Sequence, residues 1–381
     1  MEVTTKRIRL LDILRGFAVL GTLGTNIWIF AYLGDLSYLF TADHNEWWAS
    51  FNDFIRLFVL FLVNGKLLGL LTIMFGVGLE MKYQQSLRKK AAWPGIYLWI
   101  SLVLFIEGLI HFILVMEYDI LMGYGVTAMI VAFIVKRGDR AIKRAMIGMG
   151  SFHVIMIVLI MVSTIFANLQ GAHISFGNMD EAVQLYKEGS WLAQVQYRIN
   201  NFMWLRGEVI FTIPMNIFLF LLGVTLMRKG AFSPDQIGKV WRSRMLKWGL
   251  VVGIPLNLLI FVPGGVFDFP VRYLFAPVLS LGYVGLIAWL VERHQRFWLW
   301  HRFEQVGKMS LTCYVLQNIL GTTIFYGWGI GLGGKAEGLD VVLVWFLIVA
   351  FQLAFASLWL TKFSFGPMEM ARKYAVRLIK G

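Results

Sequence analysis

The sequence predicts an all-α fold, a polytopic transmembrane helical bundle of about ten spans, and three observations predict it. First, 58% of the 381 residues are hydrophobic and only 15% are charged, whereas a soluble domain is about half apolar and about a quarter charged. Second, apolar runs of about 20 residues recur, which is the length that a helix needs to cross a bilayer. Third, basic residues gather in alternate connections between these runs.

The apolar runs define the expected spans. Aromatic residues, among them 15 Trp and 13 Tyr, flank many of the runs, where their amphipathic rings suit the membrane interface. The first run is not expected to be a cleaved signal peptide, because it contains charges and no clear small-residue cleavage site follows it. The expected spans are 10–32, 64–81, 95–115, 119–136, 145–167, 208–227, 247–264, 271–291, 308–328 and 340–361.

The distribution of basic residues predicts the orientation of the bundle. Cytoplasmic loops are enriched in Lys and Arg, so the connections that carry the basic clusters are expected on the cytoplasmic side, together with both termini. The remaining connections and their membrane borders hold few basic residues, among them Lys187, Arg198, Arg206, Arg272 and Lys335. The basic clusters lie at 6–9, 82–90, 136–144, 228–247, 293–308 and 362–380.

The chain is expected to form a single transmembrane domain, 1–381, because no linker, low-complexity tract or repeat divides it. The two long loops 33–63 and 168–207 are expected outside, and their amphipathic stretches predict extra interfacial helices there. The segment 47–64 is apolar enough to be another span, but its charges and the charge alternation favour an interfacial helix. A basic amphipathic helix, 366–380, is expected on the anionic inner leaflet.

The charge and cysteine content narrow the function classes. The formal net charge of +13 does not indicate nucleic acid, because the basic residues form the short clusters that membrane topology requires. The expected partners are instead the lipid bilayer and a small-molecule, lipid or glycan substrate, and a homodimer is left open. The one cysteine, Cys313, excludes an intrachain disulfide, and neither thiolates nor the six scattered histidines indicate a metal site.

The first span carries polar residues on one face. Arg15 and Asn26 are eleven residues apart, which is three turns and about 20° of rotation. Ala18 and Thr22 lie between them on that face. One interpretation is helix packing, with Asn26 hydrogen-bonded to a neighbour and Arg15 paired with Asp12 at the membrane edge. The other is a lined cavity, in which Arg15 attracts an anion and Asn26 orients a reacting group.

The stretch EGLIHFILVMEYDILMGYG, residues 107–125, holds a second group of candidates. Glu107 and His111 are neighbours on one helix face, and a carboxylate beside an imidazole fixes its tautomer. That arrangement suits a general base, a proton relay or a ligand anchor. Asp119 and Tyr124 follow on the same stretch as further candidates. The alternative is a buried histidine bonded to a backbone carbonyl, with the acids in the headgroup region.

Two other spans carry weaker signals. In the second span, Gly65, Gly69, Thr72 and Gly76 form a lane of small residues at helical spacing, which predicts close helix packing. In the ninth span, Gln317 either forms a hydrogen bond between helices or faces a cavity. We include Gln317 with Arg15, Thr22 and Tyr124 among the candidate ligand-binding residues.

Several strings together resemble the YeiB family, bacterial membrane proteins grouped as domain of unknown function 418. They are LDILRGFAVLGTLGTNI, TIMFGVGLE, IHFILVMEYDILMGYG, GKMSLTCYVLQN and FGPMEMARK, in the expected order along the whole chain. The resemblance implies a multi-pass protein of the bacterial inner membrane, a group often described as possible transporters.

A more distant likeness concerns mechanism. LDILRG followed by Asn26, eleven positions after Arg15, resembles transmembrane acyltransferases of the acyltransferase-3 and heparan glucosaminide acetyltransferase groups, the latter with Asn at this position. That resemblance implies an acyl-CoA donor bound at Arg15 from the cytoplasm and an extracytoplasmic acceptor oriented by Asn26. No His follows Asn26 on its span, so His111 is the candidate base, with Glu107 or Asp119 as its orienting acid.

The sequence leaves three hypotheses about function. The first is an acyltransferase-like membrane enzyme. The second is a transporter or exporter of a small molecule, although the internal repeats common in transporters are not seen. The third is a lipid-binding or scaffold protein without turnover.

Overall fold

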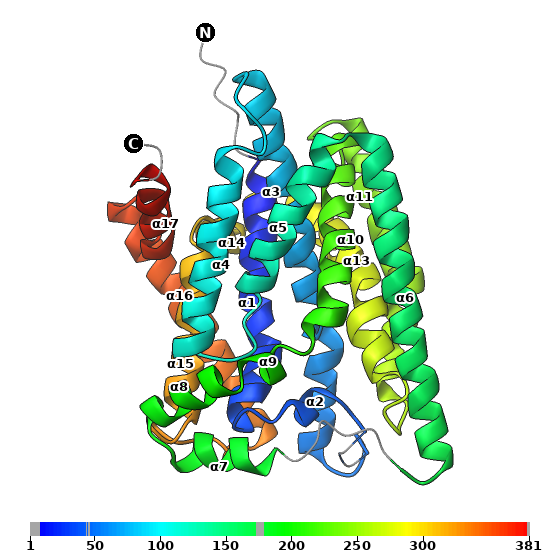
Figure 1. The fold of residues 1–381 in the computed structure, drawn as a ribbon, viewed down its shortest axis with the longest axis vertical. Coiled ribbons are helices and arrows are strands. Elements are labelled where there is room, and N and C mark those ends of the chain that lie inside the picture. Colours follow the sequence, from blue (N-terminus) through cyan, green and yellow to red (C-terminus); the bar gives the residue numbers. More distant parts are fainter. Residues whose placement is uncertain (1–7, 43, 45, 173–178, 379–381) are drawn as a thin grey trace.

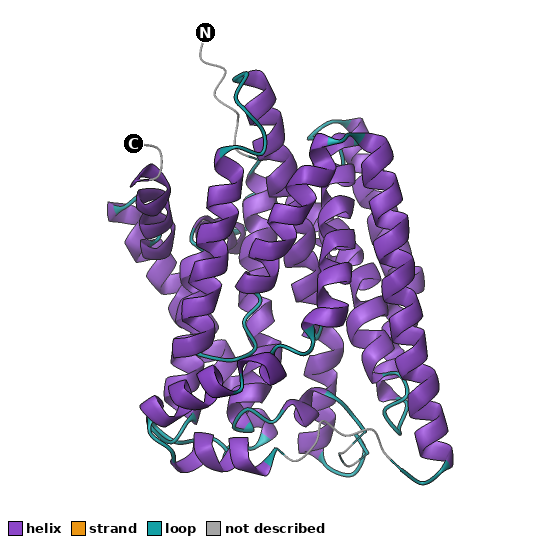
Figure 2. Cartoon of the chain, in the orientation of Figure 1, coloured by secondary structure: helices purple, strands orange, loops and turns teal. Residues whose placement is uncertain are grey.

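The chain folds into a bundle of long helices, seen in a computed structural model that describes residues 8–42, 44, 46–172 and 179–378 (Figures 1 and 2). Every regular element in these ranges is a helix, and none is a strand. The predicted all-α fold class is therefore confirmed. The basic helix expected at 366–380 is observed as α17, Pro367–Leu378, and residues 379–380 lie outside the described residues.

The other helical elements follow in chain order, and the short π-helical turns (η2, η4) and 3₁₀ turns (η1, η3) are included among them. They are α1 Arg9–Ala31, η1 Leu36–Leu39, α2 Phe51–Val63, α3 Lys66–Arg88, α4 Ile96–Leu114, α5 Leu121–Lys136, α6 Asp139–Leu169, α7 Asp180–Glu188, α8 Trp191–Asn200, α9 Phe202–Leu205, α10 Val209–Arg228, α11 Gln236–Trp248, η2 Gly249–Gly253, α12 Ile254–Leu258, η3 Leu259–Phe261, η4 Pro270–Phe275, α13 Ala276–Arg293, α14 Trp298–Lys308, α15 Ser310–Phe325 and α16 Gly338–Lys362.

In the described part of the chain, eight helical stretches are long and apolar enough to cross a membrane. They cover eight of the ten expected spans. The other two expected spans, 119–136 and 308–328, correspond to α5 and α15, which have 16 residues each. At 1.5 Å per residue such a helix is about 24 Å long, shorter than a hydrocarbon core of about 30 Å. The number of spans therefore stays a prediction.

Helix α1 is the central helix and is buried along almost its whole length. It packs closely on α14 because glycines remove side chains from the contact. A Cβ atom on Gly16 would lie 2.0 Å from the carbonyl oxygen of Phe303, and one on Gly307 would lie 1.8 Å from that of Asp12. The glycine lane of the second span acts in the same way, since Gly76 lies against the backbone of α10. The close packing predicted from these small residues is confirmed.

The bundle has two distinct ends. The first residues of α1 lie at one end, together with α17, and we call this the terminal end (Figure 1). Helices α7, α8 and α9 lie across the opposite end, together with the loop that carries η1. Exposed apolar side chains cover the outer helices α6 and α16, as expected of surfaces that contact lipid. The long loops 33–63 and 168–207 therefore meet at one end of the bundle.

Helix α2 precedes α3 in one candidate membrane-crossing stretch, Phe51–Arg88. The break between them falls at Asn64–Gly65, where Gly65 has a φ of 74°. A Cβ atom on Gly65 would lie 2.3 Å from the carbonyl oxygen of Arg272. Both the positive φ and the lack of room for a Cβ atom therefore require glycine at this position. The break also brings α2 and α3 against the start of the α13 region.

Candidate functional site

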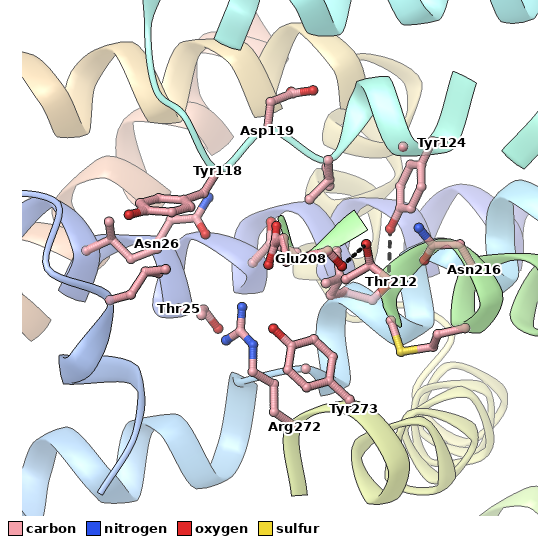
Figure 3. Close-up of a pocket in the computed structure, with 18 of the residues that line it drawn as sticks. Thr25, Asn26, Tyr118, Asp119, Tyr124, Glu208, Thr212, Asn216, Arg272 and Tyr273 are labelled. Carbon is pink, nitrogen blue, oxygen red and sulfur yellow. Dashed lines mark hydrogen bonds between the residues drawn. The ribbon is translucent and has the colours of Figure 1, made fainter. Parts of the chain in front are cut away.

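The candidate site is an inner pocket near the α7–α9 end of the bundle, close to the helix break at Gly65 (Figure 3). Its volume is about 80 Å³, which accommodates several water molecules or one functional group of a ligand. Segments from across the chain supply its walls. The lining residues are Thr22, Thr25, Asn26, Ile29, Leu36, Gly65, Leu68, Tyr118, Asp119, Ile120, Gly123, Tyr124, Arg206, Glu208, Thr212, Met215, Asn216, Arg272, Tyr273 and Tyr314.

Interrupted helices create this polar pocket. Helix α4 ends at Leu114 and α5 begins at Leu121, so the non-helical segment 115–120 passes along the pocket. Pro214 interrupts the hydrogen bonding of α10, and a π-helical turn precedes α13. Such interruptions leave backbone polar groups beside a cavity, which is where an apolar bundle tolerates them.

A chain of four buried or half-buried polar side chains leads to the pocket. His111 Nδ1 lies 3.1 Å from Asp119 Oδ1, and both side chains are almost completely buried. His111 Nε2 lies 3.2 Å from the side-chain nitrogen of Asn318. Asn318 Oδ1 in turn accepts a hydrogen bond of 3.2 Å from the side-chain amide of Asn26. Asn26 lines the pocket, so the chain connects a buried carboxylate–imidazole pair to the cavity.

This hydrogen-bond pattern selects one tautomer of His111. When the Asn318 amide donates to Nε2, the ring proton is on Nδ1 and faces the Asp119 carboxylate. The other Asp119 oxygen accepts a hydrogen bond of 2.8 Å from the backbone N–H of Met122 at the start of α5. The acid is therefore fixed by the helix that follows it, and its second oxygen lies within ion-pair distance of the imidazole.

Two predicted site residues lie in the pocket wall with other partners. Tyr124 Oη lies 2.6 Å from the hydroxyl of Thr72 on α3. Thr22 donates to the carbonyl of Val19 at 2.7 Å and accepts a hydrogen bond of 3.3 Å from Gln317. Gln317 is completely buried. Gln317 thus joins α15 to α1 beneath the pocket, at the level of Thr22.

Two predicted site residues lie elsewhere. Arg15 is close to the terminal end of α1, where its guanidinium is 3.7 Å from Asp12, and it is absent from the residues that line the inner pocket. Glu107 accepts hydrogen bonds from Arg372 on α17. Of the two acids considered as partners of His111, it is Asp119 that faces the imidazole.

Charged residues expected at the outer membrane borders also line the pocket. Arg206 donates to the backbone carbonyl of Asp119 at 2.9 Å and so holds the segment 115–120. Arg272 donates to the side chain of Asn64, and its guanidinium lies 5.3 Å from the ring centre of Tyr273. Figure 3 shows the polar ends of Arg272 and Tyr273 directed into the pocket. The signal available in the sequence was a lone arginine at the edge of an apolar run.

The segment 115–120 is also clamped from the α7–α8 side. Glu117 accepts a hydrogen bond of 2.8 Å from Tyr186, and its carboxylate is 3.8 Å from the Arg198 guanidinium. Arg198 also donates to the backbone carbonyls of Ile113 and Val115. Burial raises the pKa of Glu117 above its ordinary value, against the opposing effect of Arg198. The helices of loop 168–207 therefore fix the segment that carries Asp119.

A larger cavity, here called the vestibule, adjoins the inner pocket. It has a volume of about 570 Å³ and is bounded by residues of α7, α8 and α9. Five residues line both cavities, which makes the vestibule the approach to the pocket from the α7–α9 end. The shared residues are Leu36, Tyr118, Glu208, Arg272 and Tyr273.

Within the described residues, no three His, Cys, Asp or Glu side chains are grouped to hold a metal ion.

Comparison with known proteins gives uncharacterised relatives. Residues 226–378, from the end of α10 through α17, match the family described as "Protein of unknown function (DUF418)". The chain is 27% identical to "Uncharacterized protein YxaH" of Bacillus subtilis, over 99% of this chain and 96% of that protein. It is 25% identical to "Uncharacterized protein YeiB" of Escherichia coli, over 94% and 93%. The two relatives match nearly the whole chain, whereas the family model matches residues 226–378, so the chain is similar to these uncharacterised proteins.

Proposed function

We propose that this protein is a multi-pass protein of the bacterial inner membrane with about ten spans. Its apolar helices and the lipid-like character of its outer surface support this placement. The basic connections of the sequence put both termini in the cytoplasm. In this orientation the α7–α9 end faces away from the cytoplasm, and the vestibule opens to the extracytoplasmic side.

Within that arrangement, we infer an acyltransferase-like activity: transfer of an acyl group from a cytoplasmic acyl-CoA to an extracytoplasmic acceptor. The observation that carries this proposal is the chain Asp119–His111–Asn318–Asn26, which ends at the pocket. A carboxylate that fixes an imidazole is the arrangement of a general base. Asn26 offers its carbonyl oxygen to the pocket, since its amide nitrogen donates to Asn318.

The proposed reaction assigns each group a role. The acceptor enters through the vestibule and places a hydroxyl or amine in the inner pocket, where it displaces the Asn318 amide from His111 Nε2. Its oxygen or nitrogen attacks the thioester carbonyl, a new ester or amide bond forms, and the C–S bond breaks. His111 takes the proton that the acceptor loses and passes it to the leaving thiolate, which departs as CoA. Asp119 stabilises the transient imidazolium.

In this proposal the acyl donor binds at the terminal end of α1. Arg15 lies there with a partly exposed side chain, and a guanidinium suits the phosphates of CoA. Arg15 and Asn26 are about 16 Å apart along α1 at 1.5 Å per residue. The Thr22–Gln317 hydrogen bond lies between them. The acyl group must therefore pass this pair to reach the inner pocket.

The test uses purified protein in lipid nanodiscs with radiolabelled acetyl-CoA and a preparation of bacterial envelope as the source of acceptor. The expected result is saturable acetyl-CoA binding that Arg15→Gln weakens, and label transfer that His111→Gln and Asp119→Asn abolish without changing donor binding. Glu107→Gln is the matched acidic control and should retain transfer. Absence of binding by acetyl-CoA and by longer acyl-CoA would overturn the proposal.

A transporter is the second candidate, and one observation favours it. The inner pocket and vestibule are continuous toward one end of the bundle, as in the open state of a carrier. A carrier would exchange solute across proteoliposomes without consuming acyl-CoA, whereas the enzyme would not. A scaffold without turnover is the third candidate, and it predicts that His111→Gln and Asn26→Ala leave the cellular phenotype unchanged.

A further inference from the structure

A third cavity, here called the lateral groove, lies on the outside of the bundle between α6, α10 and α13. Its volume is about 840 Å³, and its lining is almost entirely apolar, with residues such as Ile147, Phe218 and Leu281. It lies on the side where α6 exposes apolar residues, so it is open to the surroundings of the bundle. A groove of this composition accommodates a hydrocarbon chain.

The lateral groove shares a wall with the inner pocket. Met215 and Tyr273 line both cavities, and Tyr273 also lines the vestibule. Both residues therefore contribute to the partition, and methionine has a flexible, adaptable side chain. A rotation of Met215 changes the separation between the apolar groove and the polar pocket without moving a helix.

The direction of the groove matches the direction of a membrane lipid. From Met215 the groove follows α10 to Leu222, and from Tyr273 it follows α13 to Leu281. At 1.5 Å per residue the first path is about 10 Å long and the second about 12 Å, and each leads from the level of the inner pocket toward the terminal end. A lipid in the leaflet at the α7–α9 end has its head group at that end and its chains directed the same way.

A histidine at the base of the groove fixes its shape. His153 on α6 is buried, with Nδ1 3.1 Å from the carbonyl oxygen of Phe211 and Nε2 2.9 Å from that of Tyr273. It thus links α6 to both α10 and the π-helical turn before α13. Without this link, α6 has few buried side chains to hold it at its distance from the two other helices.

The polar side of the partition carries two arginines beside the carboxylates of Asp119 and Glu208. Arg206 and Arg272 line the inner pocket, and the Nε atom of each is buried without a hydrogen-bond partner among the described residues. A phosphate oxygen is a suitable acceptor for such a group. The vestibule beside Arg272 has room for the remainder of a head group.

We infer that the lateral groove binds one acyl chain of a phosphate-bearing lipid whose head group occupies the vestibule and inner pocket. This inference rests on the proposed function and specifies its acceptor: the acceptor is carried on a membrane lipid and enters from the side, through the lateral groove. The apolar groove holds the chain, the two arginines hold the phosphate, and the head group presents its hydroxyl or amine near Asn26.

The test is photo-crosslinking in nanodiscs of phosphatidylcholine. Two probes carry the same diazirine-labelled acyl chain: phosphatidylglycerol, which has a phosphate, and diacylglycerol, which has none. We expect phosphatidylglycerol to label the peptides that contain residues 146–155 and 274–281 more strongly than diacylglycerol does. Arg272→Gln should reduce this labelling about tenfold, the effect of losing one charge-assisted hydrogen bond.

A matched pair of variants separates the groove from general lipid contact. Ile147 lines the groove and Leu159 on the same helix does not, yet the two side chains are 59% and 60% exposed. Ile147→Trp should remove the labelling and Leu159→Trp should leave it unchanged. Equal labelling by the two probes, or labelling insensitive to Ile147→Trp, would overturn the inference and show only bulk lipid in the groove.

The outcome is independent of turnover, because the crosslinking needs no acyl donor. Loss of acyl transfer with specific labelling retained would overturn the proposed enzyme and leave the lipid site. Acyl transfer to a water-soluble acceptor without specific labelling would overturn the lipid site and leave the enzyme.

Discussion

The side-chain amide of Asn26 donates a hydrogen bond of 3.2 Å to Asn318, which lies 292 residues further along the chain. This bond joins the first helix to α15, and on its other side Asn318 contacts His111 of α4. One amide therefore connects three helices at the base of the inner pocket. Asp119 also lines the pocket directly, so the Asn318 amide links the pocket to His111 in particular.

The first prediction concerns this amide. Asn318→Leu keeps the branched shape of the side chain but leaves buried polar groups of His111 and Asn26 without their partner, which costs about 1–3 kcal/mol. The variant should unfold at a lower temperature than the wild type in detergent micelles. Ile319→Ala, at a 41% exposed position on the same helix, is the control and should have a small effect. Equal unfolding temperatures of the two variants would show that the Asn318 amide does not contribute to stability.

The second prediction concerns the helix break that borders the pocket. Gly65→Ala forces an L-residue into a positive φ and places its Cβ against the backbone of Arg272. The free energy of unfolding should fall by more than about 1 kcal/mol. Gly148→Ala is the control, because nothing lies within 4 Å of its added Cβ. That variant should be neutral or slightly more stable, and thermal unfolding of both variants tests the comparison.

The sequence predicted the helices well because hydrophobic runs and helices coincide in a membrane protein. The expected span 64–81 corresponds to α3, Lys66–Arg88, which is longer than the apolar run because its last two turns are polar. The His111–Asp119 pair was among the predicted alternatives, since only seven residues separate the two across a short turn. Asn318 could not be assigned to this pair, because no local pattern reports a contact between distant spans.

The pocket arginines were missed for a different physical reason. Arg206 and Arg272 lie next to apolar runs, and counting charges places such residues outside the membrane borders. In the structure the helices around them begin late or contain breaks, so these side chains reach the pocket. Likewise Glu107 was grouped with His111 by helical spacing, but it forms an ion pair with Arg372 on α17. Such partners depend on how the helices pack.

The third prediction concerns pH and Asp268, in the loop before η4. Asp268 accepts hydrogen bonds from the backbone and hydroxyl of Thr41 at 2.7 and 2.8 Å. Burial nevertheless raises its pKa to about 6. Because the folded-state pKa is above the unfolded value, this group stabilises the fold below about pH 4, and the contribution is lost as the pH rises through about 6. The stability of the wild type relative to Asp268→Asn should therefore fall by about 2–3 kcal/mol from pH 4 to pH 7.

His44 is the reason for comparing the unfolding free energy of the wild type with that of Asp268→Asn at each pH. Burial, with a smaller effect of Arg56, lowers the pKa of His44 to about 4, so its contribution is lost as the pH falls through that value. The two groups act in opposite directions over the same range, and the wild type alone would not separate them. Both proteins contain His44, so the difference between their unfolding free energies isolates Asp268. A difference that is constant with pH would contradict the assignment.

The fourth prediction concerns the attachment of α17. Arg372 donates to both carboxylate oxygens of Glu107 on α4, and Glu369 accepts hydrogen bonds from the backbone of Leu311 and the hydroxyl of Thr312 on α15. Arg372→Gln leaves the half-buried Glu107 carboxylate without its cation, which costs more than the loss of an exposed ion pair. Helix α17 should then separate from the bundle more often, and limited trypsin digestion should cleave it faster.

The control for this experiment is Arg377→Gln, which removes the same charge from an exposed position on α17. If α17 were held only by attraction of basic residues to anionic lipid, both variants would be cleaved equally fast, and the rates would depend on the lipid charge. The two fixed contacts, at Glu107 and at the start of α15, predict instead that Arg372→Gln alone accelerates cleavage. They also predict that the acceleration persists in nanodiscs of neutral phosphatidylcholine, because the lost ion pair lies within the protein.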